Sequence, residues 1–69
     1  MFSYFRLKDS QYNGLIVKKD RTTRKEFYYD EKQQDWKPIS IMIRYFWPES
    51  ETFEMFEELS EEKVKAAIR

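Results

Sequence analysis

Thirteen of the 69 residues are aromatic, and the chain contains neither cysteine nor histidine. A chain of this length buries only about 60% of the surface that its unfolded form exposes, so its core is small. Disulfides and thiolate or imidazole zinc sites cannot reinforce that core, because the residues that form them are missing. Since each aromatic side chain can bury about 150–250 Å², aromatic packing has to supply the core of one small domain spanning residues 1–69.

Four segments have the β-branched and aromatic composition that predicts strands. They cover, approximately, residues 3–8, 15–19, 26–30 and 36–40. Asn13-Gly14 precedes the second segment and is a strong hairpin-turn dipeptide. Residues 31–35 form a polar loop between the third and fourth segments. The pattern predicts a small antiparallel meander of three or four strands.

The clearest alternation lies in residues 39–47. The apolar residues at every second position are Ile39, Ile41, Ile43, Tyr45 and Trp47. In a strand these side chains would share one face, and Pro48, which lacks an N–H, would end the pairing. We therefore expect a central strand here, with Trp47 in the core. Tyr12 and Trp36 lie outside this face and are expected to be more exposed.

The last ten residues have the pattern of a capped helix. Ser60 is a good N-cap, and Glu61 and Glu62 follow it at the positive end of the helix dipole. Leu59 and Val64 have the spacing of a hydrophobic staple. We expect a helix over residues 60–69 that packs Val64, Ala67 and Ile68 on one face of the sheet. Residues 50–59 fit a helical turn or a strand, and we favour the helical or turn-like form.

Charge is distributed unevenly along the chain, although the formal net charge is zero. Residues 1–48 carry ten Lys/Arg and six Asp/Glu, whereas residues 49–69 carry three Lys/Arg and seven Glu. Such a division is typical either of charge pairing within a fold or of a binding surface. Because the tail must fold back to bury its helix, we expect much of the pairing to be internal.

The residue types argue against several kinds of chemistry. Without histidine or cysteine, the chain lacks the usual bases that activate a nucleophile, and its one glycine cannot build a phosphate-binding loop. The glutamates do not have the spacing of a calcium loop. Glu57 and Glu61 are interpreted as part of a solvated acidic face rather than as an acid–base pair. We expect no enzymatic activity, no metal and no cofactor.

Hydropathy predicts neither a membrane span nor a secretory signal. The longest mostly apolar run, residues 39–48, is far shorter than a membrane span and contains Arg44. The N-terminus lacks a basic stretch followed by an apolar segment. The expected location is the cytoplasm, without a membrane partner.

An aromatic hairpin over residues 27–36 is combined with the capped acidic ending Phe56-Glu57-Glu58-Leu59-Ser60-Glu61-Glu62. In this combination the chain resembles short uncharacterised proteins of Gram-positive bacteria and their phages. The resemblance implies a small bacterial cytosolic domain and assigns no activity to it.

The sequence favours a role in protein interaction or in self-association as a homodimer, in a regulatory or accessory capacity. The alternative is nucleic-acid binding through a basic aromatic ribbon, because cations bind phosphates and aromatic rings stack on bases. The candidate interaction residues are Lys18, Lys19, Arg21, Arg24, Lys25, Tyr28 and Trp36. Whether the acidic tail covers this ribbon is left open.

Overall fold

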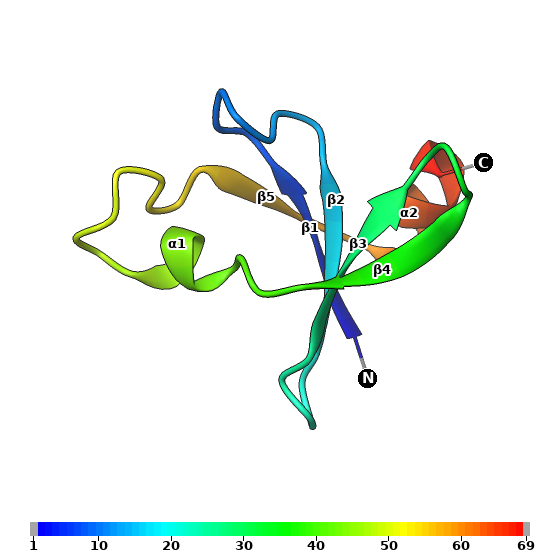
Figure 1. Cartoon of the computed structure of the whole chain (residues 1–69), viewed down its shortest axis with the longest axis horizontal. Helices are drawn as coiled ribbons and strands as arrows, with labels where there is room; N and C mark the ends of the chain where they lie inside the picture. Colours follow the sequence, from blue (N-terminus) through cyan, green and yellow to red (C-terminus); the bar gives the residue numbers. More distant parts are fainter. Residues whose placement is uncertain (1, 69) are drawn as a thin grey trace.

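The computed structural model describes residues 2–68 and has an α+β fold (Figure 1). Its strands are β1 (Phe2–Leu7), β2 (Ile16–Asp20), β3 (Glu26–Asp30), β4 (Asp35–Ile39) and β5 (Phe56–Leu59). Its helices are α1 (Ile43–Phe46) and α2 (Glu61–Ala67). The strands form one antiparallel sheet of order β4-β3-β2-β1-β5. The predicted class and the C-terminal helix are confirmed, but the predicted three or four strands are five.

The first four strands form the predicted meander. Asp30 pairs with Asp35 across the β3–β4 hairpin, so the polar segment between them is the loop. The β1–β2 connection is longer than the Asn13-Gly14 dipeptide predicted. Only Gly14 of the two has a positive φ, at 88°. Its N–H donates to the carbonyl of Leu7, which closes a wider turn that begins after β1.

Residues 39–47 do not form the predicted central strand. Ile39 ends β4, and the chain then turns into α1. Met42 and Tyr45, three residues apart, are fully buried, whereas Ile43 and Trp47, four residues apart, are 69% and 56% exposed. Burial therefore follows the helical period. An alternating apolar run is compatible with this period as well, because it also contains pairs four residues apart, such as Ile43 and Trp47. The prediction that Trp47 lies in the core is wrong for the same reason.

The position of α1 follows from the sheet order. Because β4 and β5 lie at opposite edges, residues 40–55 have to cross from one edge to the other (Figure 1). Glu26 of β3 secures the start of this crossing. Its Oε1 accepts hydrogen bonds of 2.9 Å from the N–H groups of Ile41 and Met42.

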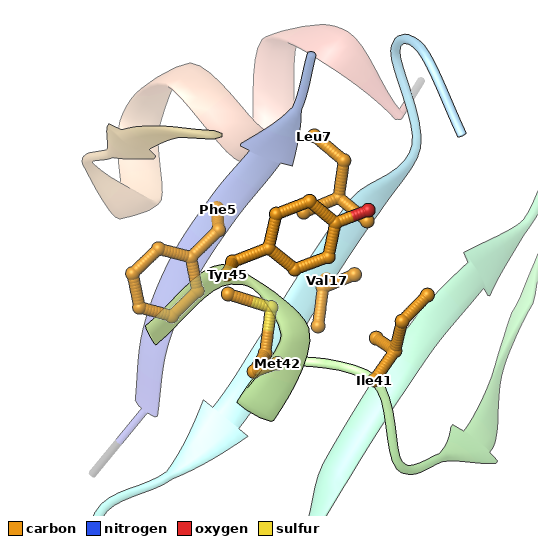
Figure 2. Close-up of a cluster of buried hydrophobic side chains, with 6 residues drawn as sticks. All are labelled: Phe5, Leu7, Val17, Ile41, Met42 and Tyr45. Carbon is orange, nitrogen blue, oxygen red and sulfur yellow. The ribbon is translucent and has the colours of Figure 1, made fainter. Parts of the chain in front are cut away.

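The main core lies between the sheet and this crossing segment. It consists of Phe5, Leu7, Val17, Ile41, Met42 and Tyr45. Figure 2 shows the side chains of Met42 and Tyr45, which come from α1 and the residue before it, directed onto those of β1 and β2. The Tyr45 hydroxyl donates a buried hydrogen bond of 2.6 Å to Oδ1 of Asp9. This contact joins α1 to the β1–β2 connection.

We favoured a helical or turn-like form for residues 50–59. The structure has turns in the first part of this segment, but the second part is the strand β5. The strand β5 pairs with β1, and Tyr4 lies opposite Leu59. One hydrogen bond continues this pairing beyond the strand, from Lys8 N–H to the Met55 carbonyl at 2.9 Å. The free edge of β1 therefore determines the conformation of β5, because it offers backbone partners that local sequence does not reveal.

Helix α2 begins as predicted and ends earlier. Ser60 is the N-cap, and its hydroxyl accepts from the Lys63 N–H at 3.3 Å. Of the predicted apolar stripe, Val64 is buried and Ile68 is half-buried, but Ala67 is exposed. A second apolar cluster consists of Ile16, Leu59 and Val64, with Tyr4, Tyr29, Trp36 and Ile68 packed against it.

Candidate functional site

The strand register assigns the sheet residues to two faces, because directly paired residues share a face. Tyr4 pairs with Lys18, Lys18 with Phe27, and Tyr29 with Trp36. We call the surface that carries these residues the Lys18 face. Its aromatic and basic members, all half-buried, are Phe2, Tyr4, Arg6, Lys18, Phe27, Tyr29 and Trp36. The main core lies on the opposite face.

Lys18 is surrounded by aromatic rings. Its Nζ lies 4.5 Å from the ring centroids of Phe2 and Trp36 and 5.6 Å from that of Phe27. Within residues 2–68, Lys18 forms no salt bridge. Partial burial lowers the pKa of its ammonium group. The rings therefore hold a cation that has no carboxylate partner in the described part of the chain.

The β2–β3 turn adds further positive charge at one end of the sheet. Arg21, Arg24 and Lys25 are exposed in the turn. Arg21 Nε donates to the Ser3 hydroxyl at 2.6 Å. Asp20 Oδ1 accepts from the N–H groups of Thr22 and Thr23, which shapes the turn. These hydrogen bonds lower the pKa of the Asp20 carboxyl group.

The structure separates two of the predicted ribbon residues from the others. Lys19 and Tyr28 belong to the opposite face, by the alternation of side chains along β2 and β3. Lys19 pairs with Glu26 at 3.9 Å, and Tyr28 packs against the main core. The ribbon of residues 18–25 is therefore not one surface, because neighbouring residues in a strand point to opposite sides of the sheet. Lys18 and Trp36 do come together.

The acidic tail forms its ion pairs away from Lys18. Glu57 lies in β5 and pairs with Arg6 at 3.6 Å and with Lys8 at 3.3 Å. Glu61 pairs with Lys65 within α2 at 3.8 Å. Glu57 is thus part of the sheet and not of the helical or turn-like form that we favoured for residues 50–59.

A second surface is the outward side of α1, which sequence reasoning did not identify. We define the α1 surface as Ile43 and Trp47, which are 69% and 56% exposed. Phe46, 40% exposed, packs edge-on against Phe5 and Phe56 instead. A groove of about 380 Å³ lies here, lined by Ile43, Arg44, Trp47 and Ser50. The signal that could have revealed this surface is the spacing of Ile43 and Trp47 by four residues, one helical turn.

The expected exposure of Tyr12 and Trp36 is only partly realised. Both are half-buried. Trp36 packs edge-on against Tyr29 with a distance of 5.3 Å between the ring centroids. Tyr12 packs against the main core, and the Arg44 guanidinium lies 5.5 Å from its ring centroid. Trp36 is thus part of the Lys18 face.

A hollow of about 560 Å³ lies where β2 and β3 diverge, and Asp30 is among its lining residues. Lys37 Nζ approaches Asp30 Oδ2 at 3.0 Å. This contact, together with backbone N–H donors, lowers the pKa of the Asp30 carboxyl group.

Among residues 2–68 no three carboxylates are placed to hold a metal ion together. In the same part of the chain no helix is long and apolar enough to cross a membrane.

Comparison of this chain with protein-family models, curated proteins and solved structures finds no match. The two surfaces described above are therefore the features from which a function of this chain can be inferred.

Proposed function

We propose that this chain is a non-enzymatic interaction domain that self-associates through the α1 surface. The observation that carries the proposal is the exposure of Ile43 and Trp47 at 69% and 56% on one helical turn. The other side of the same turn is already buried in the core. Contiguous exposed apolar groups beside polar residues are typical of interaction sites.

A second copy of the chain is the occupant that the local charges favour. Arg44 borders the apolar groove, and the segment that follows α1 carries three exposed glutamates, Glu49, Glu51 and Glu54. A two-fold axis through the groove would bring the same patch from both copies together, so each basic group could meet an acidic group of the other copy. A partner of one charge sign would gain less from such a mixed border.

The exposed area of the chain is compatible with this association. A folded chain of 8.6 kDa is expected to expose about 4,700 Å², whereas this one exposes 5246 Å². The excess, about 550 Å², is on the scale of the roughly 800 Å² that each partner buries in a typical stable interface. We also infer that α2 lies across one end of the Lys18 face, a position that the burial of Val64 with Ile16 and Leu59 supports.

Light scattering coupled to size-exclusion chromatography tests self-association across a series of loading concentrations. We expect the apparent mass to double as concentration rises, and Ile43→Asp to keep the chain monomeric. Ala66→Asp is the matched control, because it introduces the same charge at an exposed position of α2. The fluorescence of Trp47 should shift to shorter wavelength on association, with Trp47→Phe as the blank. A strictly monomeric chain at high micromolar concentration, or a dimer insensitive to Ile43→Asp, would refute the proposal.

A further inference from the structure

The Lys18 face combines groups that one ligand class needs together. We propose that it binds single-stranded nucleic acid, with bases stacked on Phe2, Phe27 and Trp36 and with phosphates bound by Lys18 and the β2–β3 turn. This role is independent of the α1 surface, which belongs to a segment that crosses the opposite face of the sheet.

The spacing of the rings fits stacked bases. One row of directly paired residues runs across all five strands: Pro38, Phe27, Lys18, Tyr4 and Leu59. Phe2 and Trp36 lie diagonally on either side of Lys18, in the adjacent rows. Strands in a sheet are about 4.8 Å apart, so the rings of Phe27 and Trp36, on the neighbouring strands β3 and β4, can receive successive bases of a splayed strand, and Phe2 lies beyond Lys18 on β1. Base pairing in a duplex hides these base faces, which favours single strands.

The charge at this site also fits a polynucleotide. Lys18 forms no salt bridge within residues 2–68, so its ammonium is available to a phosphate. The hydrogen-bond ladder between β2 and β3 continues into the turn, because the Asp20 N–H donates to the Lys25 carbonyl at 2.8 Å. The exposed Lys25, two residues before Phe27 on the same side of the chain, therefore extends the face at the end next to Phe2, which pairs with Asp20.

The opposite end of the face limits the length of the bound strand. Glu57 lies there in β5, and Glu61 of α2 is close enough to Tyr4 to contribute, after burial, to the raised pKa of that phenol. Glu57 already pairs with Arg6 and Lys8, and Glu61 pairs with Lys65. The cations at this end are therefore engaged within the protein, so the ligand should cover the rings and the turn only. A short oligonucleotide of a few residues suffices to fill the site.

Binding is tested by fluorescence anisotropy of labelled oligothymidine and oligouridine at low salt, with a DNA duplex of equal length as comparison. We expect salt-sensitive binding of both single strands and weaker binding of the duplex. Lys18→Gln should weaken binding and reduce the salt slope by about 0.7, the value for one phosphate on a single strand. Lys19→Gln is the matched control, because it removes the same charge one residue away on the opposite face. Phe27→Leu should weaken binding by about 5- to 150-fold, the range for loss of one stacked base.

Three results would overturn the proposal. The first is the absence of salt-sensitive binding to either single strand. The second is an equal loss for Lys18→Gln and Lys19→Gln, which would mean that net charge alone is responsible. The third is equal affinity for the duplex, since the rings could not then be stacking on bases. Circular dichroism of each variant establishes that the comparison is made between folded proteins.

Discussion

The hydrogen bond between Tyr45 and Asp9 gives the sharpest test of the fold. The hydroxyl donates to Asp9 Oδ1 at 2.6 Å, and the two residues are 0% and 5% exposed. Tyr45→Phe removes the donor and leaves the ring in place. Burial, followed by this hydrogen bond, raises the pKa of the Tyr45 phenol, so the group that donates is neutral in the folded protein.

The expected loss is large for so small a protein. A hydrogen bond to a charged group contributes about 1.5–3 kcal/mol, and a buried carboxylate left without its donor also keeps its desolvation cost. We expect Tyr45→Phe to lower the free energy of unfolding by about 2 kcal/mol. For a domain of this size that corresponds to a fall in Tm of about 8–16 °C.

Urea unfolding followed by circular dichroism measures this change. Tyr12→Phe is the matched control, because within residues 2–68 the Tyr12 hydroxyl has a hydrogen bond only from the exposed Gln11 amide, at 3.5 Å. We expect the control to change stability by less than about 0.5 kcal/mol. If the two variants lose the same stability, or if Tyr45→Phe is neutral, the carboxylate of Asp9 does not depend on this donor and the reasoning is refuted.

Three further predictions concern other contacts. The folded protein raises the pKa of Tyr45 above its usual 10, so above that pH the native state binds more protons than the unfolded state. The free energy of unfolding should therefore fall as pH rises above about 10. A pH series of urea midpoints should show a smaller fall for Tyr45→Phe. Glu26→Ala removes the acceptor of two backbone N–H groups at the start of the crossing segment and should lower the free energy of unfolding by about 2–3 kcal/mol. Glu26→Gln keeps one acceptor oxygen and should lower it clearly less in the same urea assay. An equal loss of stability in the two variants would contradict this role. Ser60→Ala removes the N-cap of α2 and should cost about 1 kcal/mol in thermal unfolding, whereas Ser60→Asp should be nearly neutral.

The contrast between the two lysines of β2 explains why the candidate site could be predicted only in part. Lys18 and Lys19 are equivalent in sequence, yet one lies among aromatic rings and the other pairs with Glu26. The grouping of Lys18 with Trp36 joins residues on β2 and β4, and Phe2 adds a third strand. Sequence identified the residue types that bind phosphates and bases, but it does not state which side of the sheet each one occupies.

The α1 surface was missed for a related reason. An apolar residue at every second position satisfies both a strand and one helical turn, because it supplies neighbours at spacings of two and four. Ile43 and Trp47 then lie on the side of the turn opposite Met42 and Tyr45. Local pattern cannot choose between the two conformations, since the choice depends on which neighbours cover the segment.

The sequence alone determined the features that depend on residues close together in the chain. The meander of β1 to β4, the loop after Asp30 and the N-cap Ser60 follow from turn chemistry, alternation and capping, which act over a few residues. The tertiary structure decided the course of residues 40–59. β5 is a strand because β1 offers a free edge with which it can pair. The crossing segment forms a helical turn because it covers the sheet face that carries Val17. Both outcomes result from burial and backbone pairing between segments far apart in sequence, which outweigh local preference.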